Sequence, residues 1–557
     1  MSSFGISGTN AHVILEHVPD EAVLATESKN DVQVPLTLAL RGEAALRAQE
    51  HRLSAWLAGQ PDAGLVNAAW TLASRSQWEH RSVVVAHAGM KSDVLDRGAV
   101  VRGQVIPGRT VFVFPGQGSQ WVGMGRGLWD VSDAFRERLV ECDRALAPLV
   151  GFSVVEVVRA GLGLERVEVV QPVLFAVMVA LADVWADAGV VPDVVVGHSQ
   201  GEVAAACVAG VLSLADAARV VAVRSGLLAG LRGAGGGMAS VSLPVADVER
   251  LLAADFGGAG LSVAAVNGPR SVVVSGARGV LEILVDACGR RGVRARLVDV
   301  DYASHHSDVD VVGDELVGAL EGLGHGSRSE AVMWSTVTGA VVGSGDLNGE
   351  YWLRNLRDRV CFDDVLRDLV ATGSRRFVEI SPHPVLLPAI QDRLDDAGVS
   401  GVVCESVRRG DDGATRLLLS LGRAWVHGMP VSWHGLLEGG RLVDVPTYPF
   451  QHEHYWLTSD PPAVAKGGDD VEQALWDAIE RQDVDEVTAT LGIAVDDNSG
   501  LASTLDALST WRRRRREKST ADGWRYRQTW HPVAHDQQVR LPGVWLVLVP
   551  HGRRGHQ

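Results

Sequence analysis

The segment Asp193-Val-Val-Val-Gly-His-Ser-Gln-Gly-Glu202 places one serine, Ser199, between two glycines. A short apolar run precedes it and helix-forming residues follow it, which is the pattern of a nucleophile elbow. Gly197 and Gly201 suit such a turn because the bend is sharp and neighbouring chains pass close to it. The bend lifts the serine hydroxyl clear of the sheet. The sequence therefore predicts that Ser199 is a nucleophile.

Acyl transfer through a serine also needs two N–H groups that converge on the developing oxyanion. The helix that starts after Ser199 would point the N–H of Gln200 at this oxyanion. A second glycine loop, Phe114-Pro-Gly-Gln-Gly-Ser-Gln120, follows the first strand of the same region and can present the N–H of Gln117. A tight turn is the alternative for this loop. It is not a phosphate loop, because no Gly-Lys-Ser/Thr follows.

A base for Ser199 is offered by Tyr302-Ala-Ser-His-His306. The preceding run Arg294–Val300 has the pattern of a strand, so both histidines lie just beyond a strand end, where catalytic side chains of α/β folds gather. On the residues alone His305 and His306 are equal candidates. A surface or core histidine is the alternative for each.

Composition excludes several classes of function. The 557 residues are 46% hydrophobic and carry 52 Lys and Arg against 68 Asp and Glu, so a formal charge of -16 disfavours nucleic acid and anionic membranes as partners. The arginine run Arg512–Arg516 is typical of a solvated helix face or connector. Five separate cysteines fit neither a disulfide framework nor a zinc site, which favours a reducing cytoplasm. We expect a soluble protein, since no segment approaches the ~18 uncharged apolar residues of a membrane span.

The middle of the chain, from Thr110 to about Leu437, alternates buried-strand runs with helical runs and predicts an α/β sheet. Within it, residues 238–300 carry strand, helix, strand, strand, helix and strand signals, which predict a split β-α-β insertion of ferredoxin-like shape. Before it, Val34 to Ala99 predicts a small mixed α/β linker domain. The predicted elements of the insertion are Ala239–Leu243, Val245–Ala254, Leu261–Val266, Ser271–Ser275, Gly279–Arg290 and Arg294–Val300.

The two ends of the chain look cut from a longer polypeptide. Phe4 to Leu15 predicts a glycine-turned loop and one strand, with too little sequence around it for a core. Pro446 to Trp456 combines two prolines with large aromatics and predicts an extended strap along a surface. A flexible joint at residues 466–470 and helices over residues 471–508 follow. The last two strand signals, Trp524–Trp530 and Gly543–Val549, belong to a domain that the chain does not complete.

Five motifs in this order resemble the acyltransferase domains of modular type I polyketide synthases. They are Phe114 to Trp121, Gly197 to Gly201, Arg224 ahead of Gly237-Met-Ala, Ala265-Val-Asn-Gly268 and Tyr302 to His305. The resemblance covers nearly the whole chain and implies an α/β-hydrolase-like acyltransferase core with a ferredoxin-like insertion. It implies a ketosynthase C-terminal remnant (1–19), a ketosynthase-to-acyltransferase linker domain (20–108), the acyltransferase domain (109–437, insertion about 238–300), a post-acyltransferase strap (438–460), a helical linker or dimerisation element (461–520) and the start of a ketoreductase structural subdomain (521–557).

The resemblance also assigns roles in the site. It makes Ser199 the nucleophile, His305 the base, and the N–H groups of Gln117 and Gln200 the oxyanion hole. The base in this family is oriented by a backbone carbonyl, which we expect from the segment Asn355–Phe362. Arg224 would grip the free carboxylate of a malonyl unit, because a planar guanidinium pairs with a carboxylate through two hydrogen bonds. A helix-surface arginine is the alternative.

The extender unit is predicted from further resemblances. Gln171 within Arg166–Pro172, Gln200, and the run Tyr302, Ala303, Ser304 before His305 resemble the methylmalonyl-selecting pattern, whereas malonyl-selecting relatives carry His-Ala-Phe-His at the last position. A phenylalanine would fill the space beside the acyl α-carbon, and Ser304 leaves room for a methyl group. One methyl group discriminates by only about 1–3 kcal/mol, so ethyl-bearing units remain an alternative.

The implied reaction is ping-pong transfer of a methylmalonyl unit from coenzyme A to the phosphopantetheine thiol of an acyl carrier protein. The implied partners are this carrier and the ketosynthase and ketoreductase domains of the same synthase. No metal or cofactor is expected, and the His452/His454 pair is assigned to the strap surface.

Two rival functions stay open at this point. A serine hydrolase shares the elbow but delivers the acyl group to water; Arg224 and the insertion argue against it. A non-catalytic scaffold is the second rival. Ketoreductase activity of this chain alone is excluded, because the chain ends before any G-x-G-x-x-G loop.

Overall fold

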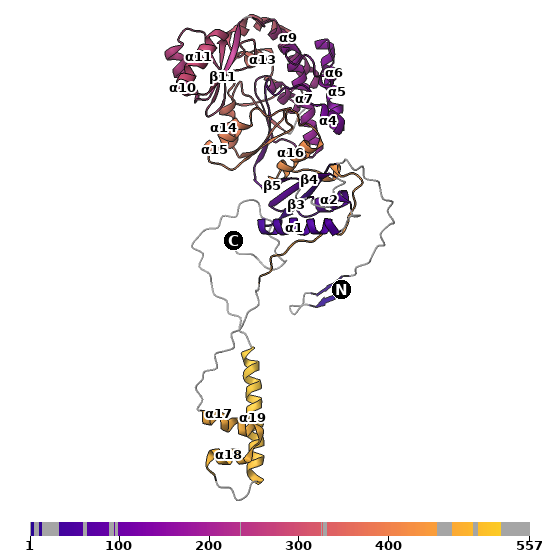
Figure 1. Cartoon of the computed structure of the whole chain (residues 1–557), viewed down its shortest axis with the longest axis vertical. Helices are drawn as coiled ribbons and strands as arrows, with labels where there is room; N and C mark the ends of the chain where they lie inside the picture. The colour runs from indigo at the N-terminus through magenta and orange to yellow at the C-terminus, as the bar shows by residue number, and fades with distance from the viewer. Residues whose placement is uncertain are drawn as a thin grey trace, which may run out of the picture. The chain divides into compact units, whose positions relative to one another are not determined.

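In the computed structural model the chain forms two compact units, Met1–His452 and Glu453–Gln557 (Figure 1). The described residues are 2–4, 10–13, 33–59, 64–87, 94, 98–233, 235–324, 326, 331–453, 470–493 and 499–524.

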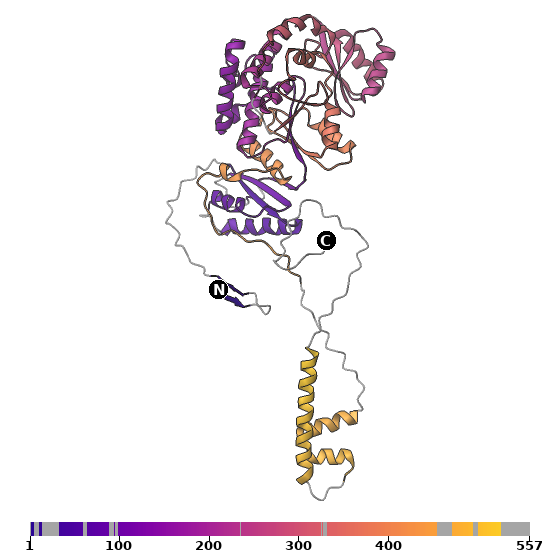
Figure 2. The same ribbon diagram turned by 180° about the vertical axis from the view of Figure 1, so that it is seen from behind.

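A three-stranded antiparallel sheet, in the order β3-β4-β5, forms the predicted linker domain. Its first two strands are runs of valine, leucine and other residues that are buried at nearly every position. Such continuous burial requires cover on both faces. Figure 2 shows α1 on one side of this sheet, and α16 (Ala414–Val426) from the later chain packs against β4 and β5. The elements are β3 (Gln33–Leu40), α1 (Glu43–Gly59), α2 (Leu65–Ala73), β4 (His80–His87) and β5 (Ala99–Gln104).

A six-stranded sheet in the order β13-β12-β7-β6-β14-β15 forms the centre of the first unit. All of its pairings are parallel except that of the short edge strand β13. β6 and β7 lie side by side in the middle, so the loops at their carboxyl ends meet at one edge. The strands are β6 (Arg109–Phe114), β7 (Val194–Gly197), β12 (Val332–Trp334), β13 (Val341–Val342), β14 (Ser374–Glu379) and β15 (Val402–Glu405).

Helices cover both faces of this sheet, as expected for an α/β fold. One face packs α5, α7 and α9 against each other, and the other packs α14 and α15 together. The helices of this region are α4 (Arg126–Val131), α5 (Asp133–Val150), α6 (Val154–Ala160), α7 (Val167–Asp187), α8 (Gly201–Val208), α9 (Leu214–Ala229), α12 (Gly313–Ala319), α13 (Gly349–Arg357), α14 (Phe362–Ala371), α15 (Leu387–Asp396) and the 3-10 turns η1 (Ser307–Val312) and η2 (Trp433–Leu436).

Helix α7 corrects the expectation that no segment approaches a membrane span. Among the described residues it alone has the length and apolar composition to cross a membrane. However, 89% of its apolar window is buried inside the protein, where it packs against α5 and α9. Its composition is therefore explained by its place in the core, since a helix that is apolar all round is a buried helix.

The insertion has all six elements that the sequence predicted, in the predicted order. They form a four-stranded sheet, β11-β8-β10-β9, in which every neighbour is antiparallel. The last strand is three residues shorter at its end than predicted, because the chain leaves the sheet after Leu297. The elements are β8 (Gly236–Val241), α10 (Val245–Asp255), β9 (Ser262–Gly268), β10 (Ser271–Ala277), α11 (Arg278–Arg290) and β11 (Ala295–Leu297).

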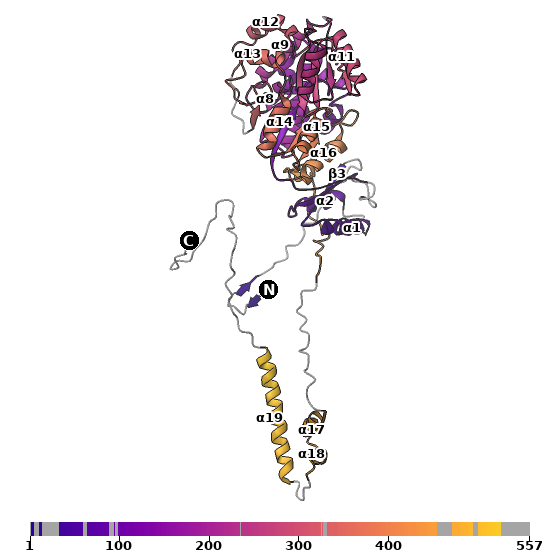
Figure 3. The same ribbon diagram turned by 90° about the vertical axis from the view of Figure 1, so that its left-hand side faces the viewer.

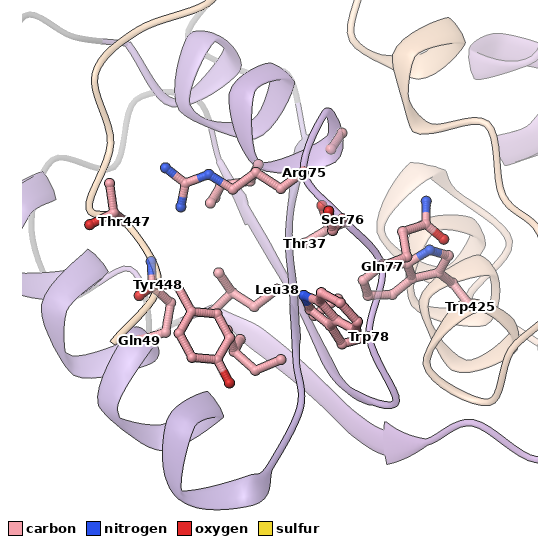
Figure 4. Close-up of a pocket in the computed structure, with 14 residues that line it drawn as sticks. Thr37, Leu38, Gln49, Arg75, Ser76, Gln77, Trp78, Trp425, Thr447 and Tyr448 are labelled. Atoms are coloured by element: carbon pink, nitrogen blue, oxygen red, sulfur yellow. The ribbon is translucent and has the colours of Figure 1, made fainter. Parts of the chain in front are cut away.

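The strap has no helix or strand over its described residues, up to Glu453, and it returns to the linker domain. There Gln49 Nε2 donates to the carbonyl oxygen of Pro446 at 2.7 Å, and Arg75 donates to the same oxygen. A pocket of about 260 Å³ lies beneath the strap. Trp78, Trp425 and Tyr448 are among the residues that line it (Figure 4). Neither Ser199 nor His305 lines this pocket, so it is separate from the predicted chemistry.

The second unit contains α17 (Asp470–Arg481), α18 (Val484–Leu491) and α19 (Ser499–Gly523), where the sequence predicted helices (Figure 3). Ala478, Ile479, Val487 and Leu505 form its small core. Helix α19 extends beyond the predicted helical end at residue 508 and includes the arginine run Arg512–Arg516, four of whose five residues are exposed, as expected for a solvated helix face. Arg512 and Arg516 both pair with Glu480.

At the other end of the chain, the segment Phe4–Leu15, predicted to hold one strand, contains β2 (Asn10–His12), which pairs antiparallel with β1 (Ser2–Phe4), a strand that ends where this segment begins. Several predictions lie outside the described residues. These are most of the joint at 466–470, His454 and the rest of the strap, and the strand signals after Trp524.

Candidate active site

Ser199 lies at the turn between β7 and α8, in the left-handed backbone region with a φ of 54°. A non-glycine residue in this region is strained, and such strain is typical of a nucleophile elbow. The flanking glycines are required by close approach. A Cβ on Gly197 would lie 2.2 Å from the N atom of Glu202, and one on Gly201 would lie 2.1 Å from the carbonyl oxygen of Phe114.

His305 contacts the nucleophile directly. Its Nε2 lies 2.8 Å from Ser199 Oγ, and its Nδ1 lies 2.8 Å from the carbonyl oxygen of Asp358. Because a carbonyl can only accept, Nδ1 carries the proton and Nε2 is free to accept the serine proton. The orienting carbonyl comes from the segment 355–362, as the sequence predicted. The His305 N–H also donates to the carbonyl oxygen of Leu356 at 2.9 Å, and its φ of 56° is left-handed like that of Ser199.

His306, the second candidate from the sequence, is directed elsewhere. Its Nε2 lies 2.7 Å from the carbonyl oxygen of Gly260 in the insertion, and its Nδ1 contacts Asp308. Of the two adjacent imidazoles, the structure therefore brings only His305 to Ser199.

The two predicted oxyanion donors lie on facing loops. A Cβ placed on Gly116 would be 3.6 Å from Ser199 Cβ, so the loop that carries Gln117 runs against the elbow. Among the described residues, the N–H groups of Gln117 and Gln200 have no hydrogen-bond acceptor. Two free N–H groups beside the nucleophile are what an oxyanion hole requires.

Arg224, on α9, is not a helix-surface arginine. Its side chain is 2% exposed, its Nη2 lies 3.3 Å from Ser199 Oγ, and its Nη1 donates to Gln171 Oε1 at 2.7 Å. No carboxylate pairs with it among the described residues, and its Nε has no partner. Burial lowers the pKa of Arg224 to about 10, so the group is still a cation at neutral pH. The site thus holds a buried positive charge beside the nucleophile without its counter-ion.

The predicted specificity residues surround the same space. Tyr302 Oη donates to Gln117 Oε1 at 2.9 Å, and Gln171 Nε2 lies 3.5 Å from both Tyr302 Oη and Gln117 Oε1. Ser304 Oγ lies 3.5 Å from Met238 Sδ. Tyr302, Ala303 and Ser304 are all buried. The loop that precedes His305 therefore forms a buried wall of the site, continuous with the arginine through Gln171.

Sequence reasoning missed the polar residues behind the elbow. Glu202 is fully buried and contacts Tyr351, Asn355 and Thr336. The only local signal was a carboxylate in the otherwise apolar helix that follows the serine.

The charge state of His305 leads to a prediction about pH. The pKa of His305 falls from 6.5 to about 3, because burial disfavours the imidazolium and the Arg224 guanidinium repels it, against a smaller opposite effect of the Asp358 carbonyl. The imidazole is then a neutral base over the whole working range. We expect the rate at which phenylmethylsulfonyl fluoride modifies Ser199 to stay level from neutral pH down to about pH 5. A fall in this rate with a midpoint near the ordinary histidine pKa would contradict the assignment.

The lowered pKa of His305 also predicts how the stability of the folded protein depends on pH, which gives a second test. Since the folded-state pKa lies below the unfolded one, the unfolded chain binds the extra proton, and stability falls as the pH drops from about 6.5 toward about 3. In urea unfolding, His305→Gln should lose less stability than the wild type over this window.

A parallel α/β sheet with a strained serine, a neutral histidine and two free N–H groups defines the class of enzymes that transfer acyl groups through a seryl ester. Comparison with known families agrees with this class. The profile described as "Acyl transferase domain" matches residues 111–431, more than half of the 557 residues. "Ketoacyl-synthetase C-terminal extension" matches residues 1–85, and "Polyketide synthase dimerisation element domain" matches residues 472–518. The chain belongs to the acyltransferase family of type I polyketide synthases.

Curated relatives are much longer proteins. The chain is 46% identical over 475 residues to mycoketide-CoA synthase of Mycobacterium tuberculosis, covering 83% of this chain and 11% of that protein. It is 44% identical over 484 residues to erythronolide synthase EryA3 of Saccharopolyspora erythraea, covering 84% of this chain and 15% of that protein. Among solved structures, the acyltransferase domain from module 8 of the salinomycin polyketide synthase matches with 45% identity and a TM-score of 0.69. That match covers 72% of this chain and 98% of that domain.

Proposed function

We propose that this acyltransferase loads a methylmalonyl unit from coenzyme A onto the phosphopantetheine thiol of an acyl carrier protein, through an ester of Ser199. The observation that carries the proposal is the uncompensated charge of Arg224, which is buried 3.3 Å from the nucleophile. Burying a cation without a partner is costly, so the site favours a substrate that brings the counter-ion. A malonyl-type acyl group has a free carboxylate two bonds from its thioester carbon and fits this requirement.

In the first half-reaction, Ser199 Oγ attacks the thioester carbon and its proton moves to His305 Nε2. The N–H groups of Gln117 and Gln200 hold the oxyanion. When the intermediate collapses, the carbon–sulfur bond breaks, and the proton passes from Nε2 to the sulfur of coenzyme A. The Asp358 carbonyl keeps the tautomer of His305 that can do both steps.

In the second half-reaction, the thiol of the carrier's phosphopantetheine gives its proton to His305 Nε2 and its sulfur attacks the ester carbon. The bond between this carbon and Ser199 Oγ breaks, and the proton returns to Oγ. The acyl group leaves as a thioester of the carrier and the resting serine is restored. The cycle needs no metal ion and no cofactor.

The wider context belongs to the same proposal. The carrier and the neighbouring ketosynthase and ketoreductase domains are the expected partners, and the parallel core and the β8–β11 sheet support an α/β-hydrolase-like core with a ferredoxin-like insertion. All five cysteines are free, which suits the reducing cytoplasm where we place the protein.

A panel of acyl donors tests this function. The full chain would be incubated with methylmalonyl-, malonyl-, propionyl- or acetyl-CoA, and the mass of the intact protein measured. The proposal expects an adduct from the carboxylated donors alone, with methylmalonyl in excess, and transfer of that adduct to added carrier protein. Adduct loss to water at a rate that the carrier does not change would instead establish a hydrolase.

Selection of the methyl group is proposed to depend on the space beside Ser304. Ser304→Phe should lower methylmalonyl loading about 10- to 100-fold relative to malonyl loading, because the ring fills the place of the α-methyl group. Competition between the two donors, read by intact mass, gives the ratio directly. Ser304→Ala is the matched control and should keep the ratio, since within the described residues Oγ has Met238 Sδ as its one hydrogen-bond partner. An unchanged ratio in the phenylalanine variant would place methyl selection elsewhere.

A further inference from the structure

Glu202 is a fully buried carboxylate three residues after the nucleophile, in the first turn of α8. No arginine, lysine or histidine pairs with it among the described residues. Instead it accepts hydrogen bonds from neutral donors. Oε1 accepts from Thr336 N at 2.5 Å and Thr336 Oγ1 at 2.9 Å, and Oε2 accepts from Tyr351 Oη at 2.7 Å and Asn355 Nδ2 at 3.0 Å.

These donors hold the backbone of the elbow on both sides of Ser199. Asn355 Nδ2 also lies 3.1 Å from the carbonyl oxygen of Ser199 itself. Thr336 Oγ1 lies 2.9 Å from the carbonyl oxygen of Gly197, two residues earlier, so its single proton can be donated either to this oxygen or to Glu202 Oε1. The carboxylate therefore fixes the side chains that in turn fix the strained turn of the nucleophile.

The same helix orients the base. Tyr351 and Asn355 belong to α13, whose last turn presents the carbonyl oxygen of Leu356 to the His305 N–H. The residue that follows the helix, Asp358, presents its carbonyl oxygen to His305 Nδ1. This helix thus contacts the serine through Asn355 and the histidine through the carbonyl oxygens of Leu356 and, just beyond its end, Asp358.

The energetic cost of Glu202 points to a role beyond packing. A buried carboxylate without a counter-ion is unfavourable even when it is well hydrogen-bonded, and apolar side chains fill such space at lower cost. Burial raises the pKa of Glu202, while its four donors act in the opposite direction. The net effect is a pKa above the ordinary value, so the donors reduce the cost of burying this carboxyl group without removing it.

We infer that Glu202, acting through Tyr351 and Asn355, is a positioning residue that sets the alignment of Ser199 with His305. It touches neither substrate nor reacting atoms. In Ser-His-Asp enzymes an acidic side chain orients the histidine directly. Here the Asp358 carbonyl orients His305, and Glu202 contributes indirectly by holding the helix that leads to this carbonyl. The kinetic test of this inference, the rate of acyl loading, rests on the proposed function. The chemical test, modification of Ser199 by phenylmethylsulfonyl fluoride, does not.

Glu202→Gln tests this positioning role most directly. The amide oxygen can still accept from both groups of Thr336, and Tyr351 Oη can turn its proton to Ser335 Oγ, 2.8 Å away. The amide nitrogen, however, faces Asn355 Nδ2 with two donors, so this contact is lost. We expect kcat for acyl loading to fall about 10- to 100-fold. KM should change less than about threefold, because Arg224, which binds the substrate's carboxylate, is untouched.

Two milder variants keep the inference testable if Glu202→Gln does not fold. Tyr351→Phe removes one hydroxyl, and Asn355→Ser removes the bridging amide. Each should lower kcat with little change in KM. The double variant Glu202→Gln/Asn355→Ser should lose no more than the worse single variant, since both break one contact.

Glu50→Gln is the matched control. Glu50 is also buried, but it pairs with Arg102 within the linker domain. This variant should lower the melting temperature while leaving kcat within about twofold. A merely structural role of Glu202 predicts the same behaviour for Glu202→Gln.

Modification of Ser199 by phenylmethylsulfonyl fluoride separates this inference from the proposed function, because the reagent carries no carboxylate and no coenzyme. The rate should fall in Glu202→Gln in parallel with kcat, and stay unchanged in Glu50→Gln. If wild-type protein reacts with the reagent but loads no acyl unit, the proposed function fails and the positioning role is still measured. A folded Glu202→Gln or Asn355→Ser variant with wild-type kcat and wild-type sulfonylation would overturn the inference.

Discussion

Ser199→Ala is expected to abolish formation of the acyl adduct and to lower carrier loading by at least about 10⁴-fold, since removal of a nucleophile eliminates the covalent route. The fold should survive the change. Alanine and serine both carry a Cβ, so the strain of the left-handed φ of 54° is the same in the two proteins. The measurement is the intact mass after exposure to methylmalonyl-CoA, with and without carrier protein.

The free cysteines provide the competing route. Cys142, Cys207 and Cys404 are poor candidates, because burial raises the pKa of each thiol well above its usual range. An adduct that persists in Ser199→Ala and is removed by hydroxylamine would place the nucleophile on another side chain. The proposed function would then have to be abandoned, whatever the geometry of the elbow.

Local features of the site could be predicted from the sequence because they depend on neighbouring residues. The elbow is specified by ten consecutive residues, and the two glycines are needed for contacts within the turn and with Phe114. The six elements of the insertion were predictable for the same reason, since each alternation of apolar and polar residues is local. Their pairing into one antiparallel sheet followed from the order of the elements.

The choice between His305 and His306 could not be made from spacing. Adjacent residues of an extended segment point to opposite sides, so either imidazole could face the serine. The decision depends on the left-handed backbone at His305 and on the Gly260 carbonyl, which holds His306 against the insertion. The Gly260 contact comes from a residue 46 positions earlier in the sequence.

The role of Glu202 was even harder to predict from the sequence than the choice between the two histidines. A carboxylate in an apolar helix suggests strain or function, but its partners lie 134 to 153 positions further along the chain. Only the tertiary structure brings Thr336, Tyr351 and Asn355 around it. The apolar length of α7 was overlooked in the sequence, and composition alone would not have separated a buried core helix from a membrane span.

Arg224→Ala is expected to reverse the preference between carboxylated and neutral acyl groups. Loading of methylmalonyl should fall about 10²- to 10⁴-fold in kcat/KM, equivalent to about 3–5 kcal/mol, since a desolvated charge pair of this kind is lost. Propionyl-CoA is the matched donor, because it differs from methylmalonyl-CoA only by the carboxylate. Its kcat/KM should rise about tenfold, because a neutral acyl group no longer leaves a buried cation unpaired.

Arg224 also affects His305, the base, and this effect adds a second expected change in the kinetics. Arg224 is one of the causes that lower the pKa of His305, and the imidazolium that forms during attack on the thioester is repelled by the same guanidinium. A bound carboxylate cancels this repulsion, so carboxylated donors gain in kcat as well as in KM. Removal of Arg224 should therefore raise kcat for propionyl, not only its affinity.

Arg224→Lys keeps the charge without the planar guanidinium and should give weak loading of both donors. If Arg224→Ala lowered the rates for propionyl and methylmalonyl in equal measure, the arginine would serve the fold of the site, and the counter-ion argument for a malonyl-type substrate would fail.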